Sequence, residues 1–99
     1  MKILLVDDDP LMQRMYGRAL DEAGFACTTV NNGADALAAV AAELPDIILM
    51  DVMMPRLNGI EALQALKADE RTRHIPVIML SAYDNPNLMQ LALDAGAAR

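Results

Sequence analysis

The strongest constraint on the fold of this chain is a regular alternation between two kinds of segment. Three runs of four apolar residues have the length and composition of strands buried on both faces, and a fourth run is rich in β-branched residues. Each run is followed by a longer segment whose apolar residues recur at helical spacing. The four expected strands are residues 3–6, 27–30, 47–50 and 77–80.

Capping residues and chain breakers mark the ends of the expected helices. Asp9 followed by Pro10 is typical of a helix N-terminus, and Gly24 is typical of the residue after a helix. Asn32 is placed to cap the second helix, which should end before Pro45. Helical connections of this kind join parallel strands with right-handed crossovers. We therefore expect an α/β fold, a doubly wound parallel sheet with helices on both faces, in one domain covering residues 1–99.

Acidic residues follow two of the expected strands. Asp7, Asp8 and Asp9 come directly after the first strand, and Asp51 comes directly after the third. In open parallel sheets, ligands bind at the carboxyl ends of the strands, where the winding reverses. If these strands are neighbours, Asp7, Asp8 and Asp51 converge, and clustered carboxylates suit Mg²⁺ or Mn²⁺. The alternative is that these residues only cap a helix and begin a loop, and for Asp9, beside Pro10, we prefer that interpretation.

A carboxylate beside a bound cation can also act as a nucleophile toward phosphorus. Ser81, at the end of the fourth expected strand, would complete such a site by donating a hydrogen bond to a phosphoryl oxygen. The alternative for Ser81 is an ordinary serine at a strand end. The acids and the hydroxyl together predict a metal-dependent phosphoryl site.

Composition limits the partners and the compartment. The net charge of −6 argues against nucleic acid as a direct partner, because phosphate backbones require a basic surface. No apolar run approaches the roughly 18–20 residues that span a bilayer, and the N-terminus lacks the features of a signal peptide. The single Cys27 cannot form an internal disulfide, which fits a reducing cytoplasm.

Four strings of residues resemble, in order and spacing, the receiver domains of bacterial two-component response regulators. The similarity extends from Lys2 to about Ala97, and a single such string would be much weaker support. The strings are Val6-Asp7-Asp8-Asp9-Pro10, Leu49-Met50-Asp51-Val52-Met53-Met54-Pro55 with Asn58-Gly59, Ile75-Pro76-Val77-Ile78-Met79-Leu80-Ser81-Ala82, and Ala92-Leu93-Asp94-Ala95-Gly96-Ala97.

The resemblance implies a flavodoxin-like sheet with strand order 2-1-3-4 and a role for each site residue. Asp51 would be the phosphoacceptor, and Ser81 the switch hydroxyl that turns toward the phosphoryl group. Asp8 and Asp51 would supply carboxylates to Mg²⁺, with Asp7 acting mainly through water and the backbone carbonyl of Met53 as a further ligand. The phosphoryl donor would be a histidine kinase, a phosphotransfer protein or a small donor such as acetyl phosphate. We do not expect a dedicated enzyme, although family members phosphorylate themselves from small donors and slowly lose the phosphate.

The sequence departs from the family at its end. A complete receiver continues with a fifth strand that ends in a lysine and with a fifth helix, whereas this sequence stops at Arg99, and neither Lys2 nor Lys67 is placed to substitute. We therefore expect a C-terminally truncated receiver with weak phosphorylation, in which the first strand loses a neighbour and exposes an apolar edge. Such an edge favours a homo-oligomer, completed by swapped or re-paired elements.

Two other functions stay open. A truncated, signalling-impaired fragment would act as an assembly or protein-binding module. An aspartyl-phosphate hydrolase of a different fold would carry a second acid two residues after its nucleophile, but this chain has Met53 there. Mass spectrometry after incubation with acetyl phosphate and Mg²⁺ separates a phosphoacceptor from an assembly module.

Overall fold

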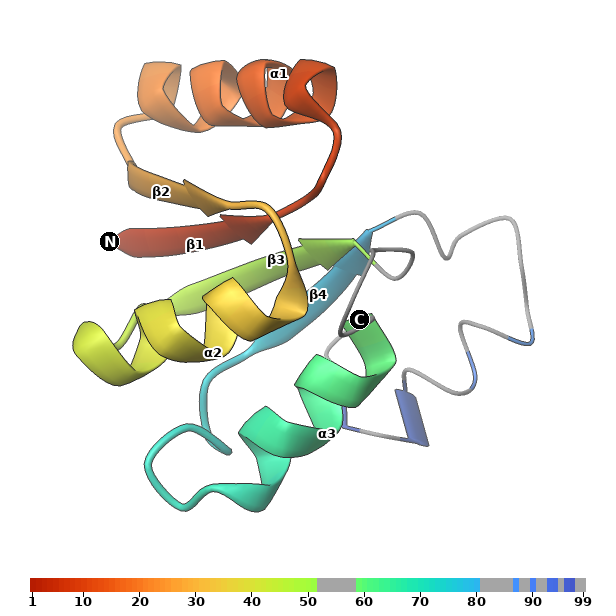
Figure 1. The fold of residues 1–99 in the computed structure, drawn as a ribbon. Helices are drawn as coiled ribbons and strands as arrows, with labels where there is room; N and C mark the ends of the chain where they lie inside the picture. The colour runs from red at the N-terminus through yellow and green to blue at the C-terminus, as the bar shows by residue number, and fades with distance from the viewer. Residues whose placement is uncertain (52–58, 81–86, 88–89, 91–92, 95, 98–99) are drawn as a thin grey trace.

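The computed structural model describes most of the chain, and its described elements alternate between strand and helix. The described residues are 1–51, 59–80, 87, 90, 93, 94, 96 and 97. The elements are β1 (Lys2–Val6), α1 (Pro10–Glu22), β2 (Ala26–Val30), α2 (Gly33–Ala42), β3 (Ile47–Asp51), α3 (Gly59–Ala68) and β4 (Val77–Leu80), as Figure 1 shows.

The strands form one parallel sheet in the order β2-β1-β3-β4, which confirms the predicted fold class and strand order. The prediction that β1 loses a neighbour is wrong. β1 pairs with β2 on one side, where Ile3 lies opposite Cys27, and with β3 on the other, where Ile3 lies opposite Ile47. The chain winds outward from β1 in both directions, so the described strands at the two edges of the sheet are β2 and β4.

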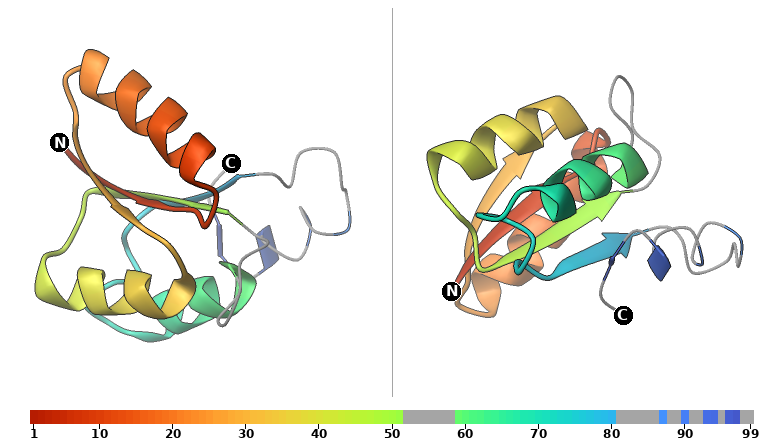
Figure 2. Two further views of the ribbon diagram at one scale, coloured as in Figure 1. Left: turned by 45° about the horizontal axis from the view of Figure 1, so that its top comes forward. Right: turned by 90° about the horizontal axis from the view of Figure 1, so that it is seen from below.

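Helices cover both faces of the sheet. α1 lies over one face, beside β1 and β2, while α2 and α3 lie side by side over the other (Figure 2). The main apolar core lies between the sheet and the α2–α3 pair. It contains Leu4, Val6, Ala36, Val40, Ile48, Met50, Ala62, Leu63, Leu66, Ile75, Val77 and Met79.

Local hydrogen bonds explain where the helices begin and end. Asp9 caps α1, and its side chain accepts a hydrogen bond of 2.9 Å from the backbone N–H of Leu11. Asn32 caps α2 in the same way, accepting from the N–H of Asp35 at 2.8 Å. Gly24 follows α1 with a φ of +91°, which glycine adopts without steric cost. No helix in the described part of the chain has both the length and the apolar character needed to cross a membrane.

Candidate metal centre

The candidate site lies at the carboxyl ends of the two central strands. β1 and β3 are parallel and in register, with Val6 opposite Met50, so the acids that come next in each strand, Asp7 and Asp51, reach the same level. The backbone N–H of Asp7 donates to the carbonyl of Val30 at 3.1 Å, which ties the end of β1 to the end of β2 as well. The two central strands therefore bring Asp7 and Asp51 together at the carboxyl-terminal end of the sheet.

Three carboxylates meet at this end of the sheet. One carboxylate oxygen from each of Asp7, Asp8 and Asp51 lies within 4.8 Å of the others. Asp7 is only 2% exposed, Asp51 is half-buried and Asp8 is exposed, so the cluster runs from the interior to the surface. In an octahedral Mg²⁺ site with bonds of about 2.1 Å, opposite oxygens lie about 4.2 Å apart. Both the donor type and the spread of these oxygens fit a small divalent cation.

The cluster concentrates negative charge. Burial raises the pKa of the Asp7 carboxyl, and the negative charges of Asp51 and Asp8 raise it further. The backbone N–H of Asp9, which donates to Oδ1 of Asp7 at 2.9 Å, acts in the opposite direction and favours the ionised form. Since the net effect disfavours the Asp7 carboxylate, a cation at this position would relieve an electrostatic cost of the fold.

A side chain that the sequence alone did not single out also reaches this site. Gln13, in the second turn of α1, donates from Nε2 to the backbone carbonyl of Asp7 at 2.6 Å and to Oδ1 of Asn31 at 2.6 Å. Helical periodicity marks apolar faces and gives no reason to select a polar residue here. The available signal is its position, one turn after the cap Asp9, where a side chain can reach back to the preceding loop.

Two predicted site residues, Met53 and Ser81, lie outside the described residues. The two lysines considered as substitutes both lie far from the acids, at the opposite end of the sheet. Lys2 begins β1 and forms an ion pair with Glu43. Lys67 donates from Nζ to the carbonyl of Ile75, just before β4, at 2.9 Å, and burial lowers the pKa of its amine.

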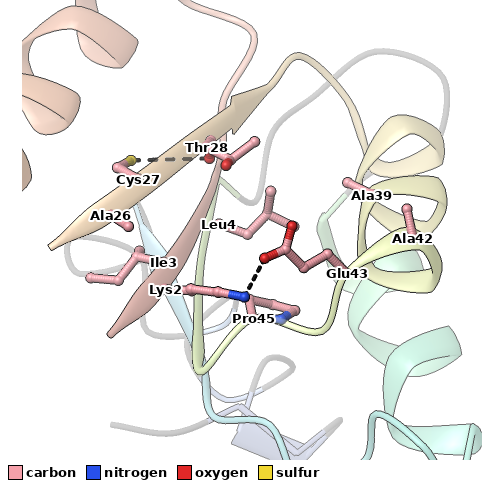
Figure 3. Close-up of a pocket in the computed structure, with 10 residues that line it drawn as sticks. All are labelled: Lys2, Ile3, Leu4, Ala26, Cys27, Thr28, Ala39, Ala42, Glu43 and Pro45. Atoms are coloured by element: carbon pink, nitrogen blue, oxygen red, sulfur yellow. Dashed lines mark hydrogen bonds and ion pairs between the residues drawn. The ribbon is translucent and has the colours of Figure 1, made fainter.

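A separate hollow of about 350 Å³ lies at that opposite end, between β1, β2 and the end of α2 (Figure 3). The ion pair of Lys2 and Glu43 forms part of its wall, and Cys27 lines it from β2. Burial raises the pKa of the Cys27 thiol, which favours its protonated form. Among the described residues, the cluster of three acids that could hold a metal ion lies away from this hollow.

Comparison with protein families gives one match over nearly the whole chain. The model of the response regulator receiver domain matches residues 3–99. Among curated proteins, the response regulator PleD of Caulobacter vibrioides is 40% identical over 97 residues, which are 98% of this chain and 21% of that protein. The phosphate regulon regulator PhoB of Pseudomonas aeruginosa is 40% identical over 95 residues, 96% of this chain and 42% of that protein. The chain thus spans about a fifth of the length of PleD and about two fifths of the length of PhoB.

Solved structures agree in fold. The chemotaxis response regulator CheY4 of Vibrio cholerae has a TM-score of 0.91 and 31% identity, covering 97% of this chain and 80% of that one. The receiver domain of the sensor histidine kinase PA1611 of Pseudomonas aeruginosa has a TM-score of 0.88 and 33% identity, covering 97% of this chain and 79% of that one. That second structure holds a magnesium ion in its active-site cleft.

Proposed function

Because the chain belongs to the family of response regulator receiver domains, we propose that it is a phosphoacceptor domain in which Asp51 receives a phosphoryl group from a histidine kinase or a phosphotransfer protein. The observation that carries the proposal is the meeting of three carboxylates from the tips of two adjacent strands. Three such groups so close together repel one another unless protons or cations offset their charge, and a divalent cation does so for carboxylates of this spacing. The compartment that we propose is the cytoplasm, where the single Cys27 stays reduced.

Asp51 is the best placed of the three acids to act as the nucleophile. Asp7 is almost fully buried, and one of its oxygens already accepts a backbone hydrogen bond. Asp51 is half-buried at the tip of β3, where a donor can reach its carboxylate while the surrounding protein limits access of water. In the transfer, a carboxylate oxygen of Asp51 forms a bond to phosphorus as the bond between phosphorus and the donor nitrogen breaks.

The residues proposed to hold Mg²⁺ or Mn²⁺ are Asp7, Asp8, Asp51 and the backbone carbonyl of Met53. The cation, when bound, would offset the negative charge of the phosphoryl oxygens as they approach the carboxylates. Asp8 is exposed and so remains accessible to an entering ion, whereas Asp7 closes the inner side of the site. Ser81 is proposed to donate its hydroxyl to a phosphoryl oxygen and to act as the switch.

Intact mass spectrometry tests the phosphoacceptor role. The chain is incubated with acetyl phosphate and Mg²⁺, and we expect one added phosphoryl group. The adduct should not form in Asp51→Asn, and it should not form in the parent chain when a chelator is present during the incubation. Asp69→Asn is the matched control, because Asp69 is also a described aspartate but pairs with Arg71 away from the cluster. An adduct that persists in Asp51→Asn, or its absence from the parent chain, would contradict the proposal.

One observation favours self-assembly as a second candidate function. β2 is an edge strand that pairs only with β1 among the described strands, and three of its five residues are exposed. Unpaired edge strands readily pair with another chain. Light scattering over a range of concentrations tests this, and a monomer throughout that range would exclude a homo-oligomer.

A further inference from the structure

We propose that Gln13 is a positioning residue for the metal site, and that its side-chain amide holds the turn between β1 and α1 so that Asp8 stays beside Asp51. The inference rests on the proposed function, because it assigns Gln13 a role in the affinity of the acidic cluster for Mg²⁺. Gln13 itself touches neither the ion nor the phosphoryl group.

The contacts of Gln13 join three segments of the chain. Its Nε2 group donates to the carbonyl of Asp7 at 2.6 Å and to Oδ1 of Asn31 at 2.6 Å, with a longer contact of 3.4 Å to the carbonyl of Val30. The two short bonds use both amide hydrogens. One side chain on α1 therefore connects the end of β1 to the end of β2 and to the turn that leads into α2.

The bond to Asp7 acts on Asp8 through the geometry of the peptide group. The carbonyl of Asp7 and the N–H of Asp8 belong to one planar unit, so a bond to that carbonyl sets the direction in which the backbone enters Asp8. Asp8 is exposed, so packing does little to fix its side chain. The position of its carboxylate therefore depends on the backbone that carries it.

Packing of α1 restrains this turn less than the packing of α2 restrains its own. Helix α1 is described throughout and fully buries none of its 13 residues, whereas α2 fully buries Gly33, Ala36 and Val40. At its N-terminal end, the amide of Gln13 adds a direct polar contact between α1 and the end of β1, while the cap by Asp9 stays within the helix. Loss of the amide leaves the cap intact but frees the peptide that precedes Asp8.

Substitution of Gln13 by Met tests the inference in the full chain, since Met has a similar length and cannot donate a hydrogen bond. Calorimetric titration with Mg²⁺ is expected to give a Kd raised about tenfold, the lower end of the effect of residues that orient metal ligands. The readout needs no phosphoryl transfer. Asn31→Ala, which removes only the partner of the second amide hydrogen, is expected to raise the Kd by a smaller factor.

Two further variants separate positioning from a general loss of structure. Thr72→Val removes a buried hydroxyl that donates to the carbonyl of Leu66 at 2.6 Å, far from the acids, and should lower stability while leaving the Kd for Mg²⁺ unchanged. In an Asp8→Asn background, Gln13→Met should change the Kd less than twofold, because the ligand that it positions is gone.

The outcomes distinguish the inference from the proposed function. If the parent chain binds Mg²⁺ and Gln13→Met binds it equally well, the role of Gln13 is refuted and the proposed function stands. The role of Gln13 is likewise refuted if Thr72→Val raises the Kd as much, or if the effect of Gln13→Met persists in the Asp8→Asn background. If the parent chain itself binds no Mg²⁺, the proposed metal site fails, and this inference fails with it.

Discussion

The two faces of the sheet differ in how they are packed. Side chains alternate between the faces along each strand, and Val6 and Met50, which face α2 and α3, are completely buried. On the face toward α1, Ile3 and Leu5 of β1 are buried, but Ile47, Leu49 and Ile78 are only partly buried, and every residue of α1 is at least partly exposed. The face toward α2 and α3 is therefore buried across its width, whereas the face toward α1 is buried at β1 and only partly covered at β3 and at Ile78 of β4.

The two faces contribute to different properties of the protein. The α2–α3 face contributes most of the stability, and the α1 face carries contacts beside the acidic cluster. A fully buried aliphatic side chain contributes about 1.5–3 kcal/mol, and the α2–α3 face holds many of them. The α1 face holds fewer such side chains, and the hydrogen bond from Gln13 to the carbonyl of Asp7, of about 0.5–1.5 kcal/mol, joins α1 to the end of β1 beside the acids. Changes in α1 should therefore cost less stability than changes on the α2–α3 face.

The largest expected effect comes from the same substitution made on each face. Leu63 on α3 is fully buried, so Leu63→Ala should lower the free energy of unfolding by about 2–5 kcal/mol. Leu20 on α1 is only partly buried, and Leu20→Ala should lower the free energy of unfolding by less, about 1 kcal/mol. Urea unfolding measures both values. Similar losses for the two variants would mean that α1 is packed as tightly as α3, and the two faces would not differ as described.

Helix caps give the next largest effect. Asp9→Ala on α1 and Asn32→Ala on α2 each remove a cap and should each cost about 0.5–2 kcal/mol. Their consequences should differ in extent, because α2 packs into the core and α1 does not. Hydrogen exchange should show faster opening confined to α1 in Asp9→Ala, and a loss of protection shared by α2, α3 and the sheet in Asn32→Ala. Exchange that rises over the whole domain in Asp9→Ala would count against a loosely held α1.

Much of the fold could be predicted because its signals are local. Wholly apolar runs such as residues 47–50 fit strands buried between two helical layers, and the capping residues Asp9 and Asn32 fit the helix starts that are observed. The state of α1 was less predictable. Its apolar residues recur at helical spacing, yet Met15 is 57% exposed, because spacing indicates which residues share a face and not how closely that face is covered.

The acidic cluster could be predicted from the order of the strands, whereas the hydrogen bonds of Gln13 beside it could not. Asp7 and Asp51 each continue a strand, so parallel pairing of neighbours brings them together. The error about the neighbours of β1 came from placing the family's fifth strand beside the first, whereas β2 and β3 occupy both sides of β1. Gln13 was missed because its role depends on three acceptors that are distant in sequence and meet only in the fold.

The smallest effect on stability is expected from a substitution of Asp7, which follows β1 at the carboxyl-terminal end of the sheet. Burial and the neighbouring acids raise the pKa of Asp7 in the fold, so its protonated form stabilises the fold and this contribution is lost as the pH rises through the folded-state pKa. In metal-free buffer at neutral pH, Asp7→Asn should therefore raise the Tm, because Asn keeps the oxygen that accepts from Asp9 and carries no charge. The gain over the parent chain should disappear as the pH falls below about 4, the ordinary pKa of an aspartate.

Calorimetric melting curves with and without Mg²⁺ complete this test. Mg²⁺ should raise the Tm of the parent chain more than that of Asp7→Asn, because a ligand that binds only the folded state stabilises it more when its affinity is higher. Asp46→Asn is the matched control, since Asp46 also accepts a backbone hydrogen bond, from Lys2, but is exposed at the other end of the sheet. A lower Tm for Asp7→Asn in the absence of metal would show that the negative charge of Asp7 does not destabilise the fold. The argument that a cation relieves an electrostatic cost at Asp7, Asp8 and Asp51 would then be contradicted.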